Sequence, residues 1–169
     1  RLSDKLGSEG GQGATSIADA VKDADVVITM VPDSPDVEGV VSGKDGVFAN
    51  AKKGTLWIDA SSIRPDVAKR LSDDAQEAGI RPLDAPVSGG EQGAINAALS
   101  IMVGGEAADF EAAQDVLNAV GKTIVHVGPS GSGQTVKAAN QLIVTVHIQV
   151  LGEAIAFLDA SRVDPAPAL

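Results

Sequence analysis

Lys137 is the residue whose surroundings first point to chemistry, because the apolar segment around it carries no other ionised side chain. It lies in "GSGQTVKAANQ" (131–141), where two glycines precede a predicted helix start. Asn140 and Gln141 follow it by three and four residues, so all three side chains can share one helix face. An ammonium beside two amides suits an oxygen-rich small molecule. The alternative is a solvated lysine with amides that cap or join helices.

A second stretch, "DAPVSGGEQGA" (84–94), combines a hydroxyl with two adjacent glycines. Ser88 supplies the hydroxyl. Gly89 and Gly90 let the backbone turn its N–H groups toward one point, because no Cβ stands in the way. Such a turn suits a carboxylate or a phosphate. The alternative is a plain tight turn between two strands.

Two predicted strands end in residues that could contact a ligand, since ligands of parallel α/β sheets bind beyond the carboxyl ends of the strands. "MVPDSPDV" (30–37) contains Val31 and Pro32, and "DASS" (59–62) contributes two hydroxyls. Ordinary turn and N-cap chemistry is the alternative for both. His126 and His147 are expected to be structural. Because the sequence has no cysteine and no paired His/carboxylate spacing, no metal site is expected.

The elements that must position these residues alternate along the chain. β-Branched apolar runs predict strands, and apolar residues at helical spacing predict helices. This alternation indicates an α/β fold with a Rossmann-type, largely parallel sheet. The predicted strands cover 23–34, 54–62, 80–88, 99–105 and 122–128, and the predicted helices cover 64–79, 106–121 and 134–158.

The last of these helices predicts a second structural unit. It would be about 38 Å long, which is more than a helix beside a sheet needs. We therefore expect a partial dinucleotide-binding domain over 1–128, and an interdomain helix opening an all-helical substrate and dimerisation domain over 129–169. Because the long helix is apolar on more than one face, a homodimer or homotetramer is expected.

The bulk composition narrows the class of protein. The 169 residues include 44% hydrophobic but only 2% aromatic side chains, so the core must be aliphatic. A net charge of −10 argues against nucleic acid or an anionic membrane as a partner. The apolar stretch 142–158 contains polar residues and is short for a bilayer. No signal peptide is recognised, and a cytoplasmic protein is expected.

Four stretches, in this order, resemble the β-hydroxyacid dehydrogenase family, which includes relatives of 3-hydroxyisobutyrate and 6-phosphogluconate dehydrogenases. They are "VITMVPDSPDV", "IDASSIRP", "LDAPVSGGEQGAINAALSIMVGG" and "GSGQTVKAANQLIV". The family's opening strand–GxGxxG–helix unit does not occur in residues 1–169, and its C-terminal helical domain is represented only by the first long helix. The resemblance therefore describes a partial chain.

The resemblance also implies roles. Lys137 would be the catalytic residue, Ser88, Gly89 and Gly90 would bind the substrate carboxylate, and Gln141 would contact substrate. Val31, Pro32 and Ser62 would contact the nicotinamide half of NAD or NADP. Many family members carry two asparagines where this chain has Asn140–Gln141.

Within the family, "SGGE" followed by "AI", together with "KAANQ", most resembles the branch that reduces tartronate semialdehyde (2-hydroxy-3-oxopropanoate) to glycerate. The implied partner is a small carboxylate-bearing aldehyde or hydroxyacid, with Lys137 as general acid. Sister specificities remain as alternatives: 3-hydroxyisobutyrate, glyoxylate or succinic semialdehyde. An alternative of another class is a non-catalytic, truncated ligand-binding module.

Overall fold

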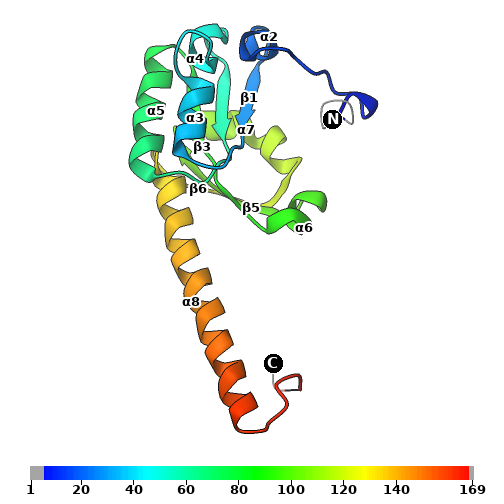
Figure 1. The fold of residues 1–169 in the computed structure, drawn as a ribbon. Coiled ribbons are helices and arrows are strands. Elements are labelled where there is room, and N and C mark those ends of the chain that lie inside the picture. Colours follow the sequence, from blue (N-terminus) through cyan, green and yellow to red (C-terminus); the bar gives the residue numbers. More distant parts are fainter. Residues whose placement is uncertain (1–5, 168–169) are drawn as a thin grey trace.

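The computed structural model describes residues 6–167, and a mixed, mostly parallel sheet of six strands forms its centre (Figure 1). The first three strands run parallel, as the expected Rossmann-type fold requires. The fifth strand pairs antiparallel with the third and fourth and parallel with the sixth. The strands are β1 (Val26–Thr29), β2 (Leu56–Asp59), β3 (Arg81–Asp84), β4 (Val87–Ser88), β5 (Leu99–Gly105) and β6 (Gly121–Gly128).

The strand predicted over 80–88 is divided into β3 and β4, with Ala85 and Pro86 between them. Both strands nevertheless pair with β5 in a single antiparallel register, and the Met102 amide donates to the Pro86 carbonyl at 3.1 Å. The division lies at Pro86 because proline has no N–H to donate to a ladder. One extended segment therefore runs from β3 to the Ser88 turn.

The predicted helices are present, and shorter helices accompany them. Pro at its first position starts α5, and its buried stripe of Ala68, Leu71 and Ala75 faces the sheet. Four helices, Ile17–Val21, Ser34–Val41, Val47–Asn50 and Gly90–Ile95, were not predicted from the sequence, because each is too short to show helical periodicity. The helices are α2 (Ile17–Val21), α3 (Ser34–Val41), α4 (Val47–Asn50), α5 (Pro65–Glu77), α6 (Gly90–Ile95), α7 (Ala107–Asn118) and α8 (Ser132–Ala160).

The core lies in two layers, one on each face of the sheet. Trp57 packs with α3, α4 and α5, whereas its neighbours Leu56 and Ile58 pack on the other face with α7. Alternate side chains of a strand point to opposite faces, so a strand covered on both faces must be apolar throughout. This explains the continuous apolar run that predicted β2, whose four residues are all buried, whereas in β1 only Val27 and Thr29 are buried and Ile28 is exposed.

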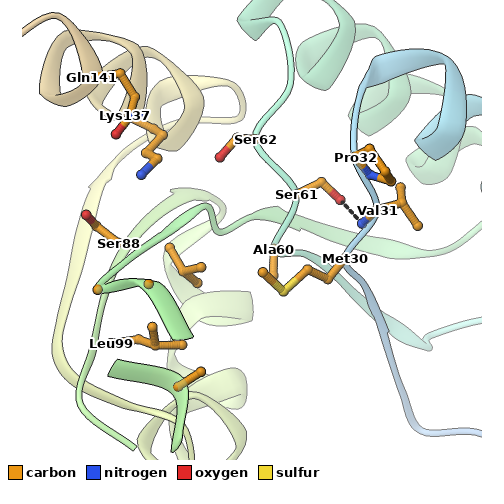
Figure 2. A pocket seen from close by; sticks show the side chains of 14 residues that line it. Met30, Val31, Pro32, Ala60, Ser61, Ser62, Ser88, Leu99, Lys137 and Gln141 are labelled. Carbon is orange, nitrogen blue, oxygen red and sulfur yellow. Dashed lines mark hydrogen bonds between the residues drawn. The ribbon is translucent and has the colours of Figure 1, made fainter. Parts of the chain in front are cut away.

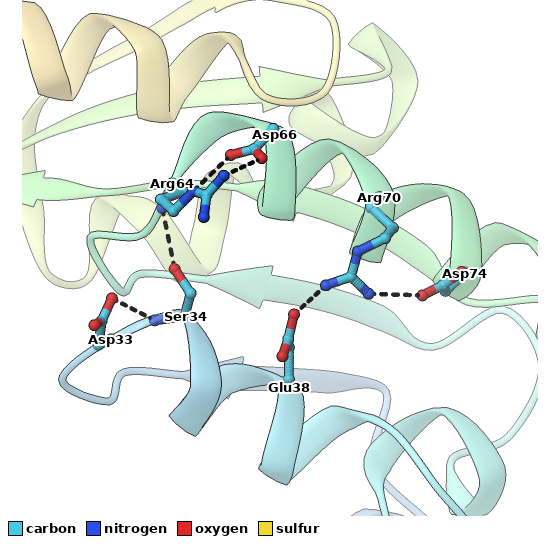
Figure 3. A network of polar contacts seen from close by, with 7 residues as sticks. All are labelled: Asp33, Ser34, Glu38, Arg64, Asp66, Arg70 and Asp74. Carbon is cyan, nitrogen blue, oxygen red and sulfur yellow. Dashed lines mark hydrogen bonds and ion pairs between the residues drawn. The ribbon is translucent and has the colours of Figure 1, made fainter.

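Polar contacts between α3 and α5 fix the loops at the carboxyl ends of β1 and β2 (Figure 3). Asp33 caps α3 in a capping box with Asp36, and the Arg64 amide donates to Ser34 Oγ at 3.2 Å. Arg70 pairs with Glu38 across the two helices. Exposed ion pairs of this kind contribute little stability. The hydrogen bonds therefore matter more for holding the two loops together.

Helix α8 starts against the sheet and then extends away from it (Figure 1). Its buried residues are confined to the first two turns, at Gly133, Gln134 and Lys137. Beyond them the helix exposes large apolar side chains, with Leu142 and Ile148 each more than two-thirds exposed. By length and composition alone α8 could also cross a membrane, a test that core helices of soluble proteins pass as well.

Candidate active site

A cavity of 520 Å³ lies beyond the carboxyl ends of β1 and β2, between them and α8. Figure 2 shows Lys137 and Gln141 projecting from α8, with Val31 and Pro32 on the opposite wall and Ser88 on a third side. Every site residue predicted from the sequence lines this cavity except Asn140. Those lining it are Val31, Pro32, Ser62, Ser88, Gly89, Gly90, Lys137 and Gln141.

Asn140 lies outside the cavity wall, although the spacing allowed it to share a face with Lys137. Its side-chain amide instead donates to Gln141 Oε1 at 3.2 Å. A residue four positions after Lys137 is rotated only about 40° from it, whereas one three positions after is rotated about 60° the other way. Gln141 therefore reaches the cavity and Asn140 contacts it only through Gln141.

Lys137 is buried, with 9% of its surface exposed, and its side chain points into the cavity (Figure 2). Within residues 6–167, nothing forms a hydrogen bond or an ion pair with its ammonium. Burial disfavours the charged form and lowers the pKa of Lys137. A lysine of this kind can exchange a proton with a bound molecule closer to neutral pH than a surface lysine can.

The predicted turn at Ser88–Gly90 connects β4 to the short helix α6. Gly89 has φ 135° and Gly90 has φ 61°, conformations that favour glycine. A Cβ on Gly89 would also lie 3.2 Å from Leu99 Cδ2. The backbone therefore requires a glycine at position 89, whereas at position 90 it favours one. The turn leads into the helix Gly90–Ile95, which was not predicted from the sequence.

The wall opposite Lys137 is apolar and open. Met30 is 68% exposed there and lies over Ala60 beside Val31 and Pro32, with the exposed Ser62 at the rim. Small-molecule sites are typically apolar surfaces with a few placed polar groups. This wall therefore offers a ligand an apolar surface with one hydroxyl, that of Ser62, at its edge.

Asp84 lies behind the cavity and was not singled out in the sequence. Its carboxylate accepts hydrogen bonds from the backbone N–H groups of Gly131 (2.7 Å) and Gln134 (2.9 Å), at the start of α8. Burial raises the pKa of Asp84, while these backbone donors act in the opposite direction. Because a carboxylate at a helix N-terminus is stabilised, Asp84 anchors the helix that carries Lys137.

Ser61 also lines the cavity, and Gln134 and Asp59 are buried residues that bond it. The sequence drew attention to Ser61 only as one of the two hydroxyls of "DASS", and Gln134 and Asp59 were not predicted to be functional. Asp59 Oδ1 accepts hydrogen bonds from Thr29 Oγ1 (2.8 Å) and the Ser61 amide (3.2 Å), whereas its Oδ2 is buried without a partner in the described residues. Burial accordingly raises the pKa of Asp59. The signals in the sequence were weak: Ser61 directly precedes Ser62, and Gln134 directly follows "GSG".

Comparison with known proteins places the chain in a family. Residues 2–128 match the family model of the NAD-binding domain of 6-phosphogluconate dehydrogenase, and residues 131–169 match the NAD-binding domain of NADP-dependent 3-hydroxyisobutyrate dehydrogenase. The chain thus belongs to the β-hydroxyacid dehydrogenase family, an oxidoreductase family that uses NAD or NADP. The resemblance and the cofactor class predicted from the sequence are confirmed, with the choice of nucleotide open.

Similar proteins include enzymes of more than one specificity. The 2-hydroxy-3-oxopropionate reductase of Escherichia coli is 42% identical over 97% of this chain and 56% of its own length. The NAD-dependent L-serine dehydrogenase of Pseudomonas aeruginosa is 42% identical over 90% of this chain and 51% of its own. The structure of Mycobacterium tuberculosis 3-hydroxyisobutyrate dehydrogenase with L-serine superposes with a TM-score of 0.89 at 34% identity, covering 96% of this chain and 55% of that one. The chain spans about half the length of the curated relatives it matches.

Proposed function

We propose that the protein containing this chain is an NAD(P)-dependent reductase that converts 2-hydroxy-3-oxopropanoate to glycerate. The observation that carries the proposal is the buried, unpaired Lys137 facing an apolar wall across a cavity that also includes the Ser88 turn. The relative that reduces 2-hydroxy-3-oxopropionate matches nearly the whole chain, which favours this substrate. A cytoplasmic location fits such metabolism.

Each wall of the cavity has a task in this proposal. The Ser88 hydroxyl and the backbone N–H groups of Gly89 and Gly90 bind the substrate carboxylate. Gln141 hydrogen-bonds the substrate beside Lys137. Val31, Pro32 and Ser62 hold the nicotinamide ring, which supplies the redox chemistry when bound. Fixing the carboxylate brings the aldehyde group next to Lys137, so that positioning lowers the barrier.

Lys137 acts as general acid in this reaction. Its ammonium hydrogen-bonds the aldehyde oxygen, donates a proton as the carbonyl becomes an alcohol, and is reprotonated from solvent. In the reverse direction the neutral amine removes the hydroxyl proton. The lowered pKa of Lys137 suits both directions, because a general acid–base group works best when its pKa lies near the working pH.

The L-serine dehydrogenase and 3-hydroxyisobutyrate dehydrogenase relatives favour a second candidate, the oxidation of a β-hydroxy acid other than glycerate. L-serine and 3-hydroxyisobutyrate each have a carboxylate and a hydroxyl on the β-carbon, as glycerate does. The carboxylate turn and Lys137 would serve all of them. Comparing kcat/KM for glycerate, L-serine and 3-hydroxyisobutyrate, with NAD and with NADP, decides between these specificities.

The experiment that tests the proposal is the substitution Lys137→Ala in the full-length enzyme that contains this chain. We expect kcat for tartronate semialdehyde to fall by about 10² or more, since general acid catalysis contributes that much. Cofactor binding, measured by quenching of protein fluorescence or by calorimetry, should persist. Lys122→Ala, at an exposed lysine on β6, is the control. A Lys137→Ala enzyme within a few-fold of wild type would rule out the proposed role.

A further inference from the structure

Gln134 is the most deeply buried polar side chain of α8, with 2% of its surface exposed. Both ends of its amide bond the loop between β2 and α5. Its Oε1 accepts from the Ile63 amide at 3.0 Å, and its Nε2 donates to the Ser61 carbonyl at 2.7 Å. The side chain therefore ties the first turn of α8 to a loop that forms the other side of the cavity.

Ser61 extends this connection to the end of β1. Its hydroxyl accepts from the Val31 amide at 3.0 Å, as Figure 2 shows, and its own amide donates to Asp59 Oδ1 at 3.2 Å. The backbone and side-chain polar groups of Ser61 are thus bonded to three different segments. A continuous path of hydrogen bonds runs from α8 to the wall at Val31.

Lys137 follows Gln134 by three residues, so the two side chains lie on the same side of α8. Gln134 bonds the loop between β2 and α5, and Lys137 points into the cavity that is lined by Ser62 of this loop and by Ser88 (Figure 2). The Gln134 amide thus links the turn of α8 that precedes Lys137 directly to the Val31–Ser62 wall. No other side chain of α8 forms a hydrogen bond to that loop among residues 6–167.

We propose that Gln134 is a positioning residue for the reaction: through Ser61 and Ile63 it fixes the distance between Lys137 and the wall that receives the nicotinamide. This inference rests on the proposed function. It does not require Gln134 for folding, because Asp84 anchors the start of α8 through backbone N–H groups that any residue at 134 would supply. The substrate carboxylate turn lies on β4 and α6, outside this path.

The first test is Gln134→Met, which keeps the length of the side chain and removes both hydrogen bonds. We expect kcat to fall about 10-fold or more, because displacements near 1 Å at a reacting group cost that much. KM for the carboxylate substrate should change less than about 3-fold. Gln76→Met, at an exposed glutamine of α5, is the matched control. A Gln134→Met enzyme with the kcat of this control would overturn the inference.

The second test is Gln134→Glu, which decides the matter even if the Met variant does not fold. A neutral carboxylic acid can still accept from Ile63 and donate to Ser61, whereas a carboxylate cannot donate. The ratio of its kcat to that of wild type should therefore rise as pH falls. The ionisable groups nearby are Asp84, which bonds the backbone amide of residue 134, Lys137, which follows on α8, and Asp59, which bonds Ser61. Dividing kcat of the variant by kcat of wild type cancels the effect of their titration, because both proteins contain them. A ratio independent of pH contradicts the inference.

Hydrogen exchange supplies a reading that does not depend on turnover. In the cofactor-free protein, the Ile63 amide should lose its protection from exchange in Gln134→Met and keep it in Gln76→Met. Equal protection of this amide in the two variants would contradict the hydrogen bond from Ile63 to Gln134. The two proposals also fail differently. An active Lys137→Ala enzyme refutes the proposed function and the positioning role with it. An inactive Lys137→Ala with an unaffected Gln134→Met refutes the positioning role alone.

Discussion

Gly133→Ala should disturb the site more than its size implies, because Gly133 lies where α8 crosses the sheet. A Cβ at this position would lie 2.7 Å from the Asp84 carbonyl oxygen and 2.8 Å from Asp84 Oδ2, and closer still to the Met102 carbonyl oxygen. Contacts below 3.0 Å are essentially never seen for real Cβ atoms. None of the three oxygens can turn away freely, since two belong to strands and the third holds the helix start.

The magnitude follows from these distances. Restoring 3.0–3.4 Å to the Asp84 carbonyl oxygen alone requires the first turn of α8 to move by about 0.3–0.7 Å, and the closer Met102 carbonyl oxygen requires a larger movement. Overpacking of this kind costs about 1–3 kcal/mol of folding free energy. For a chain of this size, each kcal/mol lowers Tm by about 2–4 °C. Lys137, one turn further along α8, moves with the helix, so kcat should fall about 10-fold or more.

Thermal unfolding and steady-state kinetics of Gly133→Ala together test this reasoning. Gly39→Ala is the control, because Gly39 lies inside α3 with nothing within 4 Å of an added Cβ. There the same substitution should stabilise by about 0.5–1 kcal/mol through the lower entropy of the unfolded chain. The two variants should thus change stability in opposite directions. A Gly133→Ala protein as stable and as active as Gly39→Ala would refute the assigned packing of α8.

Four further predictions concern the site and helix α8. Lys137→Met should abolish reduction yet raise the free energy of unfolding by about 0.5–2 kcal/mol at neutral pH, since it removes a buried unpaired charge. Denaturant unfolding of both proteins should show this gain shrinking as pH rises from the lowered pKa of Lys137 toward the pKa of a free lysine, because the wild-type lysine is then neutral in the folded protein. For the same reason, the rate of reduction should fall and that of oxidation should rise as pH increases through that pKa, and a profile of kcat against pH with no such opposition would contradict a Lys137 acid–base role. Gly89→Ala should lower kcat/KM for tartronate semialdehyde by about 10-fold to 100-fold while changing kcat/KM for glycolaldehyde much less, because only tartronate semialdehyde carries a carboxylate for the turn to bind. Equal losses for both aldehydes would mean that the turn is structural. The apolar surface of α8 at Leu142 and Ile148 should be covered in an oligomer, so light scattering at micromolar concentration should show at least a dimer and Ile148→Glu should weaken it.

The elements that build the sheet were predictable because their physical signal is local. β2 is covered on both faces, so its apolar run is continuous, and α5 shows its buried stripe at helical spacing. The apolar run of β1 also predicted a strand, although Ile28 in it is exposed. The break at Pro86 was visible in the sequence too, although not its consequence, since the register continues across it. The gathering of Val31, Ser62 and Lys137 at one cavity depended on the rule for strand ends together with the family resemblance.

The interactions that hold the site together were not predictable, because they join residues far apart in the sequence. The Gln134 side chain reaches Ser61 across 73 positions, and Asp84 reaches the Gly131 amide across 47. Nothing in a single sequence distinguishes such a glutamine from a solvated one. Asn140 is the converse case: it was expected on the Lys137 face, but its amide bonds Gln141 and it does not line the cavity.

The buried ionisable groups around the cavity differ in whether the protein itself supplies their hydrogen-bond partners. Asp84 is satisfied by backbone donors, and Asp59 is half satisfied by Thr29 and Ser61, so both serve to anchor the surrounding elements. Lys137 has no such partner and remains the one buried cation in the described chain. A fold selected for stability alone would replace it by an apolar side chain, because burying an unpaired charge is unfavourable. In the proposed function the partner that Lys137 lacks is the reacting oxygen of a bound substrate, and the bonds of Asp84 and Gln134 hold the helix that presents Lys137 to it.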